Sequence, residues 1–245
     1  MTPAIKTLPP AAPGAKAVPR LENGDLLSRE EFERRYKAAP RWQKAELIDG
    51  VVHMPSPVRH RRHGKPQSRL SGWVVHYETA TPGIESSGNG TLRLDDSSEP
   101  QPDAFLLISP EFGGQAVIDE DDYVAGAPEW VGEIAASSVS YDLHVKLRAY
   151  QRNGVKEYVV WRVEDGAVDW FVRRGDKFQP LPSSEIYKSE VFPGLWLDAS
   201  AMIAGDLKKV FQVLDQGLAT PEHSAFVQQL QQRRDQLAKK SEKEQ

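Results

Sequence analysis

The chain of 245 residues lacks several features, and each absence removes a class of protein from consideration. It contains no cysteine, so it forms no disulfide and offers no thiolate to a metal, as is typical of a reducing cytoplasm. No run of about eighteen apolar residues occurs, so the sequence predicts no membrane-spanning helix. The formal net charge of −4 argues against a surface that is basic all round. We therefore expect a cytoplasmic protein whose contacts with nucleic acid, if it makes them, are local.

Familiar enzyme motifs are missing as well. The sequence has no Gly-x-x-x-x-Gly-Lys-Ser/Thr phosphate loop and no serine in a Gly-x-Ser-x-Gly elbow, and Gly88-Asn-Gly90 lacks the spacing of a dinucleotide site. The histidines at 53, 60 and 63 straddle a predicted turn without a fourth ligand, which disfavours zinc. These classes find no support in the sequence.

What the sequence does contain is a pair of carboxylates on predicted neighbouring strands. Asp103 follows Pro102 directly before the predicted strand 104–108, and Glu133 lies in the middle of the predicted strand 129–136 among small and apolar residues. An unpaired charge there would cost on the order of several kcal/mol, so Glu133 requires a metal or a cation. Hard divalent cations held by carboxylates stabilise the charge that builds up when water attacks a phosphodiester. The pattern therefore favours metal-assisted phosphodiester cleavage.

A lysine is predicted close to these acids. In the predicted helix 141–152, Asp142, Lys146 and Tyr150 recur every four residues and share one face. A lysine beside the phosphate can orient or activate the nucleophile and offset negative charge, which makes Lys146 the best basic candidate. The alternative is a surface ion pair between Lys146 and Asp142 worth about 0.3 to 0.5 kcal/mol. Tyr150 by itself is more typical of core packing than of catalysis.

In order and spacing, four motifs resemble the Uma-type family of putative restriction endonucleases, which is assigned to the PD-(D/E)XK nuclease superfamily. The resemblance covers roughly Leu21 to Leu214, and the motifs are Glu46-Leu-Ile-Asp-Gly50, Pro102-Asp103, Glu133-Ile-Ala-Ala-Ser-Ser138 and the run from Asp142 through Lys146 and Tyr150 to Gly154-Val-x-Glu-Tyr158. It implies an α/β (α+β) fold with a restriction-endonuclease-like core, a mixed central sheet flanked by helices, and extra hairpins.

The same resemblance implies a site. Asp103 and Glu133 would bind Mg²⁺ or Mn²⁺, and Glu46 would be a third acid that completes or tunes the set of metal ligands. Lys146 would be the basic catalytic residue of an endonuclease acting on DNA. Supporting roles fall to Asp142, to Tyr150, and to His60 as a phosphate contact or a helper of the active site. Nucleases of this architecture commonly pair as twofold dimers, so a homodimer is expected by analogy.

Two alternatives stay open at this point. The superfamily usually carries its lysine two residues after the glutamate, where this chain has Ala135. Either the relocated Lys146 keeps the activity, or the domain binds nucleic acid or serves in assembly with weak cleavage or none. Glu46, beside a hairpin turn, also has the simpler interpretation of a solvated strand residue.

A basic segment at 59–65 adds a candidate surface for the substrate backbone. Arg59, Arg61, Arg62 and Lys65 could neutralise phosphates beside the acidic site. The alternative is a solvated loop whose charges only maintain solubility.

The chain is predicted to contain one domain, 21–218, between a disordered leader at 1–20 and a polar C-terminal helix or tail at 219–245. The leader is rich in Pro and Ala and lacks the apolar stretch of a secretory signal. Predicted elements are a helix capped by Ser28, hairpins around Asp49-Gly50 and Glu164–Gly166, helices at 65–79 and 201–214, a strand at 91–94, and a loop at 109–126 with solvated acids at 119–122.

Overall fold

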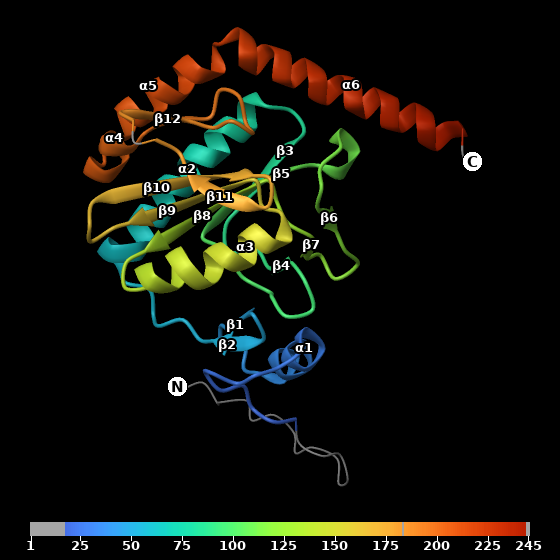
Figure 1. Cartoon of the computed structure of the whole chain (residues 1–245), viewed down its shortest axis with the longest axis vertical. Coiled ribbons are helices and arrows are strands. Elements are labelled where there is room, and N and C mark those ends of the chain that lie inside the picture. The colour runs from blue at the N-terminus through green and yellow to red at the C-terminus, as the bar shows by residue number, and fades with distance from the viewer. Residues whose placement is uncertain (1–17, 183, 244–245) are drawn as a thin grey trace, which may run out of the picture.

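A six-stranded mixed sheet forms the centre of the molecule in the computed structural model, which describes residues 18–182 and 184–243 (Figure 1). Most of the predicted leader lies outside these ranges. The strand order is β11-β10-β9-β8-β5-β3, in which β8 and β9 run parallel and all other neighbours antiparallel. The strands are β3 (Ile84–Ser87), β5 (Ala104–Ile108), β8 (Trp130–Ala135), β9 (Glu157–Arg162), β10 (Ala167–Arg174) and β11 (Lys177–Pro180). The predicted mixed sheet with flanking helices is confirmed.

Both faces of this sheet are covered, which explains why β5 and β8 are apolar along their length except at Glu133. Every residue of β5 and β8 is buried. Because side chains alternate along a strand, Trp130 and Ile134 join the core on one face of β8, whereas Val131 and Ala135 join the core on the other. Glu133 therefore belongs to the second face.

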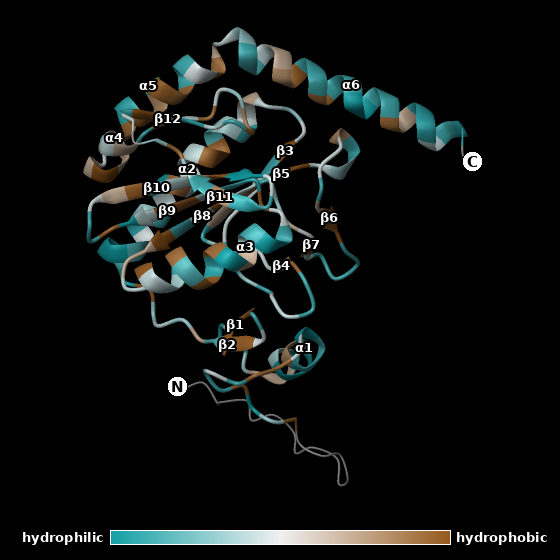
Figure 2. Cartoon of the chain, in the orientation of Figure 1, coloured by the Kyte–Doolittle hydropathy of each residue, from teal (hydrophilic) through white to brown (hydrophobic). Residues whose placement is uncertain are grey.

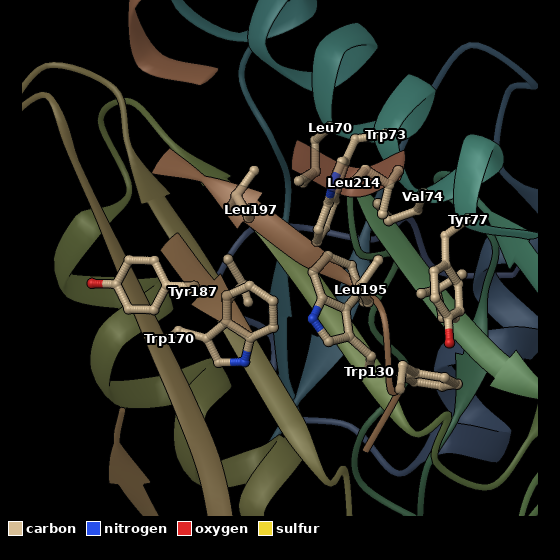
Figure 3. Packing of buried hydrophobic residues seen from close by; sticks show 14 of the residues in the cluster. Leu70, Trp73, Val74, Tyr77, Trp130, Trp170, Tyr187, Leu195, Leu197 and Leu214 are labelled. Atoms are coloured by element: carbon tan, nitrogen blue, oxygen red, sulfur yellow. The ribbon is translucent and has the colours of Figure 1, made fainter. Parts of the chain in front are cut away.

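The first face carries the larger core (Figure 3). Trp73 packs edge-on against Trp130 and Trp170, with ring centroids 5.9 and 6.2 Å apart. Its indole N–H donates to the carbonyl of Trp196 at 3.0 Å, so the buried ring leaves no polar group unsatisfied. The elements on this side are α2 (Lys65–Ala80), β12 (Ile186–Lys188), β13 (Trp196–Asp198), α4 (Ala199–Ala204) and α5 (Leu207–Leu218).

The second face is covered by the helix that follows β8, and its first part departs from the prediction. Residues Tyr141–Lys146 form a π-helix, η3, and only Leu147–Asn153 form the α-helix α3. A π-helix inserts extra residues into a helical turn and is frequent at functional sites. It carries Asp142 and Lys146, whereas Tyr150 lies on α3 and packs at a tilt against Tyr158 with ring centroids 5.0 Å apart.

A small N-terminal unit packs beside α3 (Figure 1). It comprises α1 (Arg29–Ala38) and the hairpin of β1 (Glu46–Ile48) and β2 (Val51–His53), around a core of its own formed by Leu21, Phe32, Ala45, Leu47 and Val52. The predicted hairpin turn is confirmed, since Asp49 and Gly50 both adopt positive φ, as a two-residue turn of this type requires. The Ser28 cap also forms, accepting from the Glu31 N–H at 3.3 Å.

The segment 109–126, predicted to be a loop, is more regular than expected. It contains η2 (Pro110–Phe112), β6 (Val117–Ile118) and β7 (Val124–Ala125), and β7 pairs in parallel with β4 (Leu92–Arg93). Asp119, predicted to be only solvated, accepts a hydrogen bond from the largely buried Arg93 at 2.6 Å. A buried guanidinium needs carboxylate partners, and this need orders the acidic segment.

The C-terminal region also differs from the prediction. The predicted helix 201–214 is two helices, because Gly205 ends α4 with φ of 82° and the Asp206 side chain caps α5. The polar helix α6 (Pro221–Lys243) is mostly hydrophilic (Figure 2), yet its Phe226 and Leu230 are buried in the main core. The sequence predicted a polar helix or tail here, and two apolar residues one turn apart attach this helix to the core. Within the described ranges, no helix combines the length and apolar character needed to cross a bilayer.

Gly132 allows the close packing of Trp130, which generates a stability prediction. A Cβ at Gly132 would lie 2.5 Å from the Trp130 ring, whereas a Cβ at Gly72 on α2 meets nothing nearer than 4.0 Å. We expect Gly132→Ala to lower the free energy of unfolding by about 1 to 3 kcal/mol through overpacking. Gly72→Ala should raise it by up to about 1 kcal/mol, because alanine favours the helix. Urea denaturation of both variants would test this, and equal effects would contradict the packing described.

Candidate active site

Asp103 and Glu133 face each other across two paired strands. Ala104 pairs with Gly132 in the antiparallel ladder of β5 and β8, and continuing that register places Asp103 opposite Glu133. Side chains directly opposed in this way have Cβ atoms about 4.5 to 5.5 Å apart. Asp103 Oδ2 also accepts a hydrogen bond from the Ile134 N–H at 2.8 Å, which fixes its carboxylate against β8. The structure thus brings together the two acids that the sequence analysis paired.

Lys146 reaches the same place from η3. Its Nζ lies 2.9 Å from Glu133 Oε1 and 3.2 Å from both oxygens of Glu46. The lysine side chain is only 7% exposed, so the alternative of a surface pair with Asp142 is wrong. The ammonium instead lies between two carboxylates that come from different parts of the chain.

Glu46 is delivered by the N-terminal hairpin. Leu47 and Glu99 exchange backbone hydrogen bonds of 3.3 and 2.6 Å, which tie β1 to the segment leading into Asp103. Glu46 Oε1 accepts a further bond from the Gln101 N–H at 2.6 Å. Glu46 is 12% exposed as a side chain, so the alternative of a solvated strand residue is wrong as well.

Burial shifts the ionisation of these groups. It raises the pKa of Glu133 well above its ordinary range, and the neighbouring Lys146 opposes that shift. Burial alone would lower the pKa of Lys146, but the carboxylates of Glu133 and Glu46 outweigh it and raise the lysine pKa well above its ordinary value. Lys146 therefore remains a cation at neutral pH, and Glu133 takes up a proton more readily than a solvated carboxyl would.

Asp142 and Tyr150 complete the buried cluster. Burial raises the pKa of Asp142 to about 6, although Ser138 Oγ donates to its Oδ2 at 2.6 Å. Tyr150 packs in the core as predicted, and its hydroxyl also donates to Glu133 Oε1 at 2.8 Å. Glu133 Oε1 thus accepts from both Lys146 and Tyr150, which holds the carboxylate in one orientation.

His63 is the site residue that the sequence analysis missed. Its Nε2 lies 3.3 Å from Asp103 Oδ1, and this contact raises the pKa of the imidazole. The predicted helper, His60, is exposed instead. Both histidines lie in a second π-helix, η1 (His60–Gly64), directly before α2. The sequence contained both histidines, but it did not show which of the two side chains would lie on the side of the helix that faces Asp103.

The predicted basic surface is exposed, and one of its residues forms an ion pair with an acidic side chain. Arg59, Arg61, Arg62 and Lys65 are all exposed, and Arg62 forms an ion pair with Glu164 at 2.8 Å. His53, the third member of the histidine set, packs at a tilt against the Tyr141 ring with centroids 4.4 Å apart. That contact docks the open end of the hairpin onto η3.

The carboxylates of this site suit a hard cation that keeps part of its water, and not a metal ion enclosed by protein ligands alone. In residues 18–182 and 184–243, no three His, Asp or Glu side chains are arranged to hold a metal ion. Mg²⁺, however, is usually bound through one or two carboxylates together with water and substrate phosphates. The opposed carboxylates of Asp103 and Glu133 fit that mode. A separate pocket of about 300 Å³ beside Phe105 and Leu107 is lined by neither Asp103 nor Glu133.

Comparison with known proteins shows the family and the fold that this chain resembles. The family model Uma2, described as "Putative restriction endonuclease", matches residues 29–200. The chain is also similar to a solved structure, that of a putative nuclease belonging to DUF820 from Anabaena variabilis, with a TM-score of 0.50. The two sequences are 13% identical, over 74% of this chain and 97% of that one, so the likeness shows a shared fold. The search of curated proteins found no match.

The burial of Lys146 generates a pH-dependent prediction. Lys146→Met would leave Glu133 and Glu46 without their cation, and breaking a buried ion pair costs about 3 to 5 kcal/mol. Burial raises the pKa of Glu133 and Lys146 opposes that shift, so removing Lys146 raises the pKa of Glu133 further. A raised pKa in the folded state makes stability fall as pH rises, and this fall is steeper in the variant than in the unmodified protein. We expect a larger loss at pH 8 than at pH 5, measured by denaturant unfolding.

Two further variants control this experiment. Adding Glu133→Gln to Lys146→Met should restore much of the stability at pH 8, since one uncompensated carboxylate disappears. The exposed Lys177, replaced by Met, should change little. Equal losses at both pH values, with no recovery in the double variant, would contradict the charge balance described.

Proposed function

Since the chain belongs to the Uma2 family of putative restriction endonucleases, we propose that it is a metal-dependent endonuclease that hydrolyses phosphodiester bonds in DNA. The family and the nuclease-like fold support a nuclease. Metal dependence and the choice of DNA are our extension of that finding. The observation that carries the proposal is the ammonium of Lys146, held 2.9 Å from Glu133, which lies opposite Asp103.

In this proposal, Asp103 and Glu133 hold Mg²⁺ or Mn²⁺, and Glu46 tunes the site through Lys146. The metal, when bound, would neutralise charge on the phosphate and acidify the attacking water. Asp103 is kept in place by the Ile134 N–H, and Glu133 by the Tyr150 hydroxyl. These fixed donors prepare the carboxylates before substrate arrives, so little reorganisation is needed at the moment of reaction.

Lys146 acts in this scheme as a positive charge and not as a proton acceptor. Its raised pKa keeps the ammonium protonated at neutral pH. A fixed cation next to the phosphate stabilises the negative charge that accumulates on the non-bridging oxygens. Together with Asp142, it would position the attacking water.

A second candidate is a nucleic-acid-binding or assembly module that has kept the scaffold without the turnover. This alternative is supported by Ala135, which stands at the strand position where the superfamily usually carries its lysine. Ala135 is fully buried. The contact between Lys146 and Glu133 favours the endonuclease, because the amine of the relocated lysine points into the site and not into solvent.

Removing either proposed metal ligand should abolish activity. We expect Asp103→Asn and Glu133→Gln to reduce Mg²⁺-dependent nicking of supercoiled plasmid by at least about a hundredfold, since each removes a fixed charge from the transition state. Chelation with EDTA should have the same effect on the unmodified protein. Asp176→Asn, at an exposed turn, is the matched control and should remain active. Cleavage that persists in both ligand variants would refute the assignment.

His63 should matter more than His60, contrary to the expectation from sequence. His63→Ala removes the partner of Asp103 Oδ1, and loss of a residue that orients a metal ligand typically costs about 10- to 100-fold in activity. His60→Ala, which removes an exposed ring, should cost less than about twofold if phosphate contact is its only role. The same plasmid assay compares them, and the reverse order would argue against the His63–Asp103 contact.

A further inference from the structure

Trp42 is unusual among the tryptophans of this chain because its side chain is almost fully exposed. It is 82% exposed, whereas Trp73, Trp130, Trp161 and Trp170 are at most 3% exposed. Single exposed hydrophobic residues are common on protein surfaces and need no explanation alone. The surroundings of Trp42 are therefore what decide its role.

The surroundings are cationic and concave. Arg20 and Trp42 line one surface groove of about 410 Å³. Arg41 and Lys44 flank the tryptophan in sequence, and within the described part of the chain none of these three cations has a carboxylate partner. Two acids of this unit, Asp25 and Glu31, both pair with Arg35, which also lines the groove. The groove thus joins an open aromatic face to unneutralised positive charge.

A short segment connects this groove to the hairpin strand that carries Glu46. Trp42 precedes Glu46 by four residues, so their Cα atoms are at most about 14 Å apart. Glu46 pairs with His53 at the open end of the hairpin, so the chain enters and leaves at that same end. The segment that leaves carries Arg59, Arg61 and Lys65. Basic residues before and after the hairpin therefore flank the end that presents Glu46 to Lys146.

We propose that Trp42 stacks on an unpaired base of the nucleic acid while Arg20, Arg41 and Lys44 contact its backbone. This inference rests on the proposed function and adds to it a substrate class, DNA that is single-stranded next to the cleaved bond. Aromatic side chains in cationic grooves bind single strands in this way, because every base has a face on which an indole can stack. In duplex DNA those faces are covered by neighbouring bases, so the indole would find no partner.

Binding measured without cleavage tests the inference. The full chain in EDTA is titrated against a fluorescent single-stranded oligonucleotide and against the same sequence as a duplex, with anisotropy as the readout. We expect Trp42→Ala to weaken single-strand binding by at least about fivefold and duplex binding by less than about twofold. Trp42→Phe, which retains a ring, should stay within about threefold of the unmodified protein. Leu26→Ala, at another highly exposed apolar residue, is the matched control and should bind normally.

Several results would overturn the inference. One is single-strand binding that is absent, or unchanged by Trp42→Ala. Another is an equal loss for single strand and duplex, which would show that the indole does not select unpaired bases. A third is dimerisation in gel filtration that disappears in Trp42→Ala, which would assign this face to a second copy of the chain. If the binding results hold but no plasmid or oligonucleotide is cleaved with Mg²⁺ or Mn²⁺, the endonuclease proposal fails and the stacking surface stands.

Discussion

The interaction on which the rest of this structure depends is the buried ammonium of Lys146 between the carboxylates of Glu133 and Glu46. None of the three could remain charged at this depth alone, because removing a charge from water costs more than folding can supply. Each residue comes from a different element: the central strand β8, the N-terminal hairpin and the π-helix η3. Charge balance therefore requires all three elements to be in place together, and the site forms only when the whole domain does.

This requirement explains the local structure around the site. The hairpin is tied to the segment before Asp103 through the Leu47–Glu99 backbone bonds, and its open end docks on Tyr141 through His53. The π-helix places Asp142 and Lys146 toward the sheet before α3 continues with Tyr150. Wider helical turns of this kind are retained where a function offsets their poorer backbone geometry.

The central sheet separates stability from chemistry. On one face of β8, Trp130 packs with Trp73 and Trp170 in a large apolar core. On the other face, the same strand holds Glu133 against Lys146 and Tyr150. A strand with an apolar face and a functional face can hold a carboxylate rigidly, because its backbone is fixed by packing that the site does not share. The net charge of −4 is compatible with nucleic acid as a ligand, since exposed basic residues precede and follow the hairpin along the chain.

The sequence alone was sufficient for features that depend on neighbouring residues. The Asp49-Gly50 turn, the Ser28 cap and the strand around Glu133 are all local patterns, and each predicted its element correctly. The family motifs are local as well, and they indicated the family correctly. Other features were decided by contacts between distant segments. His63 rather than His60 meets Asp103 because of the phase of η1, Lys146 pairs with Glu133 and Glu46 instead of Asp142, and Arg93 orders the acidic residues near Asp119. In each case a buried charged group pairs with an oppositely charged group that the fold brings close to it. The distance between two such groups in space is not specified by their spacing along the chain.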